Sequence, residues 1–184
     1  AYFANRNFAY LSGLDGAEVR DFILLARKTD AGVEETVFAL PPDPMAERWT
    51  GRRLKPEEIT ERSGVTAVLP LGRFETVFHA AAMSGQYRVL ALDLWKKDRK
   101  DPDTEAYRLA AQAGADYPFL RVENCHSQLC AQRTIKAPCE IEAMRKAMEI
   151  TKAGIEAMMR ASRPGMYEYE YKAAFDHALT SRGV

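Results

Sequence analysis

Residues 47–54, ERWTGRRL, gather the side chains of this chain that are best suited to touch another molecule. Trp49 is one of only two tryptophans, and Arg48, Arg52 and Arg53 lie close to it in sequence. An indole ring offers a flat apolar surface, and a guanidinium group can pair with a carboxylate through two parallel hydrogen bonds. These residue types predict binding. The structural alternative places Trp49 in the core, with the arginines on a solvated rim.

A second group with possible chemistry is formed by Cys125, His126 and Cys130. His126 and Cys130 are four residues apart, so they share one face if the segment is helical. A closed zinc site needs four ligands, and only Cys139 is nearby in sequence. Packing or exposed helix positions are therefore favoured over a metal site.

The two remaining histidines, His79 and His177, are isolated from other catalytic residue types in the sequence. We see no nucleophile with an adjacent base, no G-x-S-x-G motif and no glycine-rich phosphate loop. The sequence therefore predicts no catalytic residue, no metal ligand and no bound cofactor in this segment.

Composition narrows the class of protein further. The 184 residues carry a formal net charge of zero, with 47% hydrophobic and 28% charged residues. No basic block predicts nucleic-acid binding, and no apolar run is long enough for a membrane span. The three cysteines are an odd number at irregular spacing, which favours reduced thiols and a cytoplasmic location.

The elements that must position these side chains alternate between strands and helices. Short apolar runs bounded by Gly, Pro or Asp predict strands at residues 7–14, 22–28, 35–40, 66–71, 88–94 and 117–122. Residues 29–34 predict a hairpin connection with Gly32 in it. Helices are predicted from Pro56 to a stop at Gly64, over 71–85, and from Pro102 to Gly114. The pattern predicts an α/β fold with a mixed sheet.

The last third of the chain is predicted to be helical. Residues 138–162 carry apolar side chains at three-and-four spacing, and residues 168–183 form a second helix after the break at Pro164 and Gly165. The shared stripe is formed by Ile141, Met144, Met148, Ile155, Met158 and Met159. Two helices cannot cover both of their apolar stripes, so we expect a second domain to begin at about residue 134 and to continue beyond this sequence. The front of the sequence also looks trimmed.

Four segments, read in order, resemble the Xaa-Pro aminopeptidase (aminopeptidase P) group of the creatinase/prolidase family. They are FANRNFAYLSGL, ERWTGRRL, RTIKAPCEIEAMRKAMEITKAG and RPGMYEYEYKAAFDHALTSRGV. The third segment, with Arg133, Lys136 and Glu140, is the most specific, because it resembles the family's passage into the catalytic domain.

The resemblance implies two domains. Residues 1–133 are expected to form an amino-terminal domain with a ribonuclease-H-like mixed sheet and flanking helices, without the family's first edge strand. Residues 134–184 are expected to form the opening helical hairpin of a truncated pita-bread catalytic domain. Two divalent metal ions, expected to be manganese, are implied for the remainder of that domain, beyond this segment.

The resemblance also implies a function and a set of partners. The parent protein is expected to be a homo-oligomer, a dimer or a tetramer, that removes the N-terminal residue preceding proline from peptides. Trp49, Arg52 and Arg53 are expected to bind substrate at the entrance of a neighbouring subunit's active site. Neither nucleic acid nor membrane is expected as a partner.

Three alternatives remain open at this point. The parent could be a prolidase that takes dipeptides, although the W-x-G-R-R pattern favours the aminopeptidase. It could be a non-catalytic protein-interaction module of the same architecture. It could also be a creatinase-like amidinohydrolase, against which the tryptophan segment weighs weakly.

Overall fold

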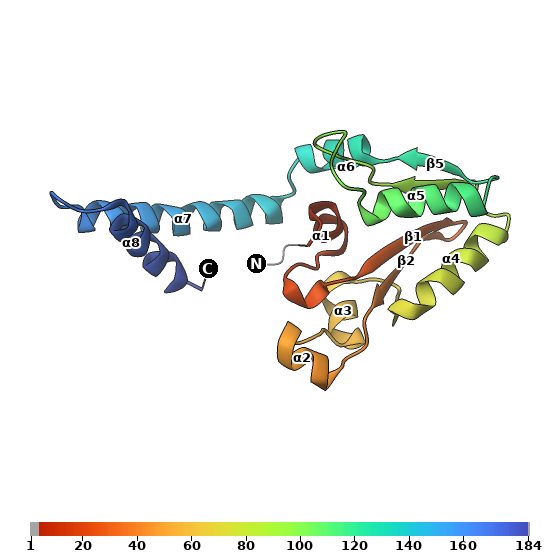
Figure 1. Cartoon of the computed structure of the whole chain (residues 1–184), viewed down its shortest axis with the longest axis horizontal. Coiled ribbons are helices and arrows are strands. Elements are labelled where there is room, and N and C mark those ends of the chain that lie inside the picture. The colour runs from red at the N-terminus through yellow and green to blue at the C-terminus, as the bar shows by residue number, and fades with distance from the viewer. Residues whose placement is uncertain (1–3, 184) are drawn as a thin grey trace. The chain divides into compact units, whose positions relative to one another are not determined.

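A computed structural model describes residues 4–183, and Figure 1 shows the helices and strands that they form. The chain divides into two compact units, Ala1–Leu129 and Cys130–Val184. Within residues 4–183, none of the helices combines the length and the hydropathy that a membrane span requires.

The first described element is a helix, α1 (Arg6–Ser12), so the strand predicted at residues 7–14 is wrong. Capping explains the difference. Asn5 Oδ1 accepts hydrogen bonds from the backbone N–H groups of Asn7 and Phe8, at 2.9 and 3.1 Å. Gly13 ends the helix in the left-handed region, with φ 70°. These two local signals outweigh the strand preference of the aromatic residues between them.

A three-stranded mixed sheet follows, as predicted. Strands β1 (Ile23–Thr29) and β2 (Gly32–Ala39) form an antiparallel hairpin. Thr29 pairs with Gly32, so the connection holds only two residues and is tighter than the predicted one. Strand β3 (Ala67–Pro70) pairs with β2 in parallel.

A second pair of strands is separate from this sheet in backbone pairing. Strands β4 (Val89–Leu92) and β5 (Arg121–Asn124) run parallel to each other. The strand predicted at residues 117–122 begins too early. Helix α5 (Glu105–Asp116) runs to the residue before Tyr117, and a turn closed by the bond from Leu120 N to Tyr117 O, 2.8 Å, comes before β5.

The other helices of this part of the chain connect the strands. They are α2 (Pro44–Thr50), α3 (Pro56–Ser63), α4 (Phe74–Met83) and α6 (His126–Thr134), with short 3-10 helices at Ala17–Val19 and Leu71–Arg73. Helix α3 begins at Pro56 and is closed by Gly64, as predicted. Helix α5 begins three residues after Pro102, since Asp103 bonds to Lys96 in the preceding loop. It also runs two residues past Gly114, where the prediction ended it.

Apolar side chains cover both faces of the three-stranded sheet. Val37 belongs to a cluster on one face and the adjacent Phe38 to a cluster on the other, and both are fully buried. On the Phe38 side, the ring of Phe74 meets Phe38 edge-on at 5.4 Å and stacks on Phe78 at 5.7 Å. Leu90 of β4 packs against the same cluster, so the second strand pair shares this core.

The second unit contains two helices, α7 (Pro138–Ala161) and α8 (Glu168–Thr180), both as predicted. Glu140 Oε2 accepts the backbone N–H of Ala137 at 2.8 Å, which fixes the start of α7. The two helices approach closely at the buried Gly154. A Cβ atom there would lie 2.5 Å from Leu179 and 2.6 Å from Phe175 of α8.

Candidate functional site

Helix α2 carries Trp49 at its exposed end. Asp43 caps the helix, since its Oδ1 accepts the backbone N–H groups of Met45 and Ala46 at 3.0 and 3.2 Å. Gly51 closes it with φ 88°. Trp49 is 88% exposed, which excludes the alternative that it fills the core of this chain.

The two arginines after Trp49 are tied to the surrounding backbone and side chains. Arg52 forms an ion pair with Glu58 of α3, and this hydrogen bond and charge raise the pKa of Arg52. Arg53 Nη1 donates to the carbonyl oxygen of Pro41 at 2.6 Å. Both guanidinium groups therefore help to hold the turn that connects α2 to α3.

Arg52 and Arg53 line a small hollow of about 190 Å³. Glu18, Arg20 and Asp21 also line it. Asp21 adopts the left-handed region, with φ 62°. Trp49 is not among the lining residues, so the structure brings the two arginines together and leaves the indole outside the hollow. Guanidinium groups in this setting can pair with a carboxylate, and the exposed indole can pack on an apolar ring.

The residues considered as metal ligands do not form a metal site. Among residues 4–183, no three or more His, Cys, Asp or Glu side chains are placed to hold a metal ion. Cys125 precedes α6, while His126 and Cys130 lie on it. Burial, followed by the charge of Asp93, raises the pKa of the Cys125 thiol, which makes it a weaker nucleophile.

His126 instead bonds to Asp93, a residue that the sequence analysis did not select. The distance from His126 Nδ1 to Asp93 Oδ1 is 2.7 Å. One signal could have found this pair: Asp93 lies near the end of the strand predicted at residues 88–94, His126 follows the strand predicted at 117–122, and side chains at the carboxyl ends of parallel strands converge.

The other two histidines have different surroundings. His79 Nδ1 and the Tyr117 hydroxyl are 2.9 Å apart, and the two rings are in contact. His177 is exposed in the last turn of α8.

Fold and surface together define a class of protein: a mixed α/β domain that presents an exposed aromatic side chain, joined to a helical hairpin. Residues 1–90 match the family model described as the aminopeptidase P N-terminal domain. Over residues 1–90 the chain is therefore similar to the amino-terminal domain of aminopeptidase P.

Curated relatives extend this similarity over nearly the whole chain. A Xaa-Pro aminopeptidase from Haemophilus influenzae is 28% identical over 94% of this chain and 38% of its own length. The one from Escherichia coli is 26% identical over 100% of this chain and 41% of its own length. The chain thus corresponds to the amino-terminal part of these proteins and spans about two fifths of their length.

Solved structures show the same fold. A Bacillus anthracis protein provisionally assigned as an aminopeptidase P superposes with a TM-score of 0.90 at 32% identity, over 98% of this chain and 42% of that one. Proline aminopeptidase P II from Yersinia pestis superposes with a TM-score of 0.75 at 24% identity, over 100% of this chain and 44% of that one.

Proposed function

We propose that this chain is the substrate-entrance and oligomerisation part of a metal-dependent Xaa-Pro aminopeptidase. The parent protein would remove the N-terminal residue that precedes proline from a peptide. The observation that carries this proposal is the continuous similarity to proteins named Xaa-Pro aminopeptidase over 94–100% of the chain. The fold of residues 4–183, shared with the Bacillus anthracis structure, supports it.

Trp49 is proposed as the substrate-facing residue. A tryptophan that is 88% exposed loses the benefit of burying a large ring, unless another molecule covers it. The pyrrolidine ring of proline is a compact apolar partner that can pack on the flat indole. Because the entrance would lie on a neighbouring subunit, the proposal includes a homo-oligomer, either a dimer or a tetramer.

Arg52 and Arg53 are proposed to act with Trp49 in substrate binding. Arg52 is bonded to Glu58 and Arg53 to the Pro41 carbonyl, so both also fix the turn after Trp49. A guanidinium that is already oriented pays less entropy when it meets a carboxylate of a peptide or of a neighbouring subunit.

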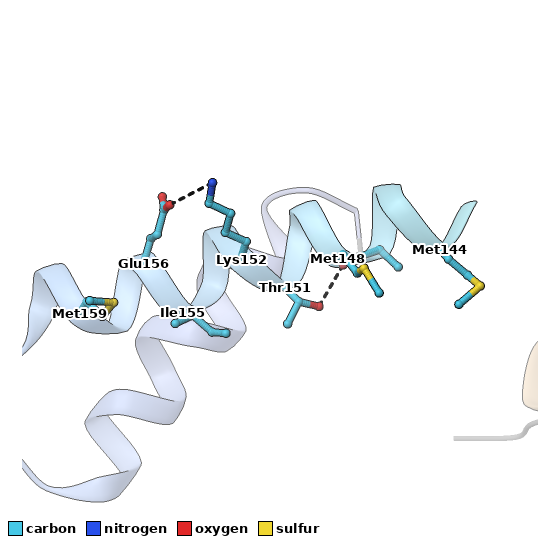
Figure 2. A pocket seen from close by; sticks show the side chains of 8 residues that line it. Met144, Met148, Thr151, Lys152, Ile155, Glu156 and Met159 are labelled. Carbon is cyan, nitrogen blue, oxygen red and sulfur yellow. Dashed lines mark hydrogen bonds and ion pairs between the residues drawn. The ribbon is translucent and has the colours of Figure 1, made fainter. Parts of the chain in front are cut away.

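Residues 134–184 are proposed to begin the catalytic domain. Met144, Met148, Ile155 and Met159 lie along one face of α7 and line an apolar groove of about 630 Å³ (Figure 2). All four side chains are exposed, and the ion pair of Lys152 with Glu156 borders the groove. Since curated relatives are more than twice as long as this chain, we propose that the rest of a catalytic domain covers this face.

The metal ions belong to that further part of the protein in this proposal. The described residues offer no metal-ligand cluster, so this segment does not fit the two metal ions, expected to be manganese, and we derive no metal-dependent step for it. The three cysteines, all free thiols, support a cytoplasmic location.

A peptidase assay on the natural protein that carries this sequence tests the proposal. We expect cleavage of Ala-Pro-containing tripeptides, none of matched Ala-Ala tripeptides, and loss of activity with a chelator that added manganese restores. Cleavage of Ala-Pro dipeptides alone would identify a prolidase instead. If the natural protein had an intact mass above 20.7 kDa and no peptidase activity, the alternative of a non-catalytic protein-interaction module would be favoured.

A further inference from the structure

Polar side chains from three distant parts of the sequence meet where β4 and β5 end. Asp93 follows β4, His126 follows β5 and begins α6, and Asn7 lies on α1. The proposed function uses none of these three residues. Asn7 is only 7% exposed, which is unusual for an amide side chain and calls for a hydrogen-bonded partner.

Asp93 is the centre of this group. Its Oδ2 accepts a hydrogen bond from Asn7 Nδ2 at 2.7 Å, and its Oδ1 accepts one from His126 Nδ1 at 2.7 Å. The side chains of His126 and Asp93 are each about one quarter exposed. One carboxylate therefore joins α1, the end of β4 and the start of α6, and both of its bonds are short.

His126 is also held by its ring and by its backbone. The ring of Trp95 stacks on it, with the centroids 5.7 Å apart and the planes 19° apart. Asn124 Oδ1 accepts the backbone N–H of His126 at 3.0 Å, and also that of Leu94 at 3.1 Å. The first residue of α6 is thus held by a backbone hydrogen bond, a side-chain hydrogen bond and a stacking contact.

Helix α6 has no buried apolar face, so polar contacts at its start contribute to holding it. None of its described residues is buried, whereas a buried apolar face stabilises most helices. It has nine residues, and the boundary between the two compact units falls within it, between Leu129 and Cys130.

We propose that the bonds of Asp93 to Asn7 and His126 form a latch that holds the first turn of α6 to the strand ends of the first unit. The latch controls local opening of α6, the helix in which one unit passes into the next. The sheet β1–β3 does not depend on it, since none of the latch residues belongs to the two apolar clusters that cover that sheet.

Hydrogen exchange measured by mass spectrometry tests the latch. We compare the protein with Asp93→Asn, which keeps the shape but removes the charge, and with His126→Gln. His79→Gln is the matched control, because His79 also makes one side-chain hydrogen bond, to Tyr117. We expect amides of residues 129–134 to exchange about 10-fold faster in both latch variants. Amides of β1 and β2 should keep their wild-type rates in all three variants.

Three results would overturn the latch. If the amides of α6 exchanged at wild-type rates in His126→Gln, the bond of His126 to Asp93 would not hold the helix. If exchange accelerated equally in α6 and β2, the variant would have lost only global stability. His126→Gln added to Asp93→Asn should have a smaller effect than it has alone, and full additivity would also contradict the proposal. His126→Gln changes a partly exposed ring, so it serves as the test even if Asp93→Asn fails to fold.

Discussion

Trp49 and the two arginines that follow it are neighbours in sequence, yet the structure gives them different settings. The indole is exposed, whereas Arg52 and Arg53 are bonded to Glu58 and to the Pro41 carbonyl. Substitution of either arginine would therefore disturb the turn after α2 as well as any contact with substrate. Trp49 is the residue of this group whose substitution reports on binding most cleanly.

Glu58 makes the pH dependence of this turn predictable. Its Oε2 accepts the backbone N–H of Lys55 at 2.9 Å, and its other oxygen pairs with Arg52. The Lys55 bond first, and Arg52 second, lower the pKa of Glu58. A carboxyl whose pKa is lower in the folded state contributes stability that is present above its ordinary pKa, about 4.3, and is lost as pH falls through the lowered value.

We therefore expect Glu58→Gln to have a lower thermal midpoint than the wild type at about pH 6. Between about pH 6 and about pH 3, the thermal midpoint of Glu58→Gln should fall less than that of the wild type. Glu57→Gln, one residue earlier in the same helical turn, is the control. Its thermal midpoint should fall on acidification by as much as that of the wild type. Thermal melts of the three proteins across this range make the comparison. If the thermal midpoint of Glu58→Gln fell with pH as steeply as that of the wild type, the bonds of Glu58 would contribute nothing to stability.

The sequence could select Trp49, Arg52 and Arg53 as candidates because they lie within five residues of each other. The sequence analysis did not select the pair of Asp93 and His126, which lie 33 positions apart with a whole helix between them. Only the parallel pairing of β4 with β5 brings these two side chains together.

Among the elements, predictions succeeded where local signals and periodicity agree. The hairpin of β1 and β2, the start of α3 at Pro56, and the two long helices α7 and α8 are examples. The strand prediction for residues 7–14 was wrong because their aromatic residues favour a strand, while the caps at Asn5 and Gly13 specify a helix. Periodicity over so short a segment cannot decide between the two.

The packing of α7 against α8 depends on Gly154. A methyl group there would overlap Phe175 and Leu179, so Gly154→Ala should cost about 1–3 kcal/mol in packing, against about 1 kcal/mol gained in helix propensity. Gly114→Ala in α5 is the matched control, because no atom lies within 4 Å of its added Cβ and only the gain remains. Chemical denaturation should show Gly154→Ala less stable and Gly114→Ala more stable than the wild type. The reverse order would contradict the close approach.

At the scale of the whole molecule, the proposals concern two exposed surfaces of residues 4–183: Trp49 on α2 and the apolar groove on α7. We propose a neighbouring subunit for the first and the rest of a catalytic domain for the second. The sequence predicts both surfaces from residue types and spacing. No residue pattern within this chain specifies what covers them.

The steady-state kinetics of the natural protein with Trp49→Ala, on an Ala-Pro tripeptide, test the central claim most directly. We predict that kcat/KM falls by about 10-fold or more, because truncating a tryptophan at a binding contact typically costs more than 1 kcal/mol. Phe119→Ala, which removes another exposed aromatic ring of the same unit, should leave kcat/KM unchanged. A wild-type kcat/KM in Trp49→Ala, with the protein folded, would show that this chain does not present Trp49 to the substrate.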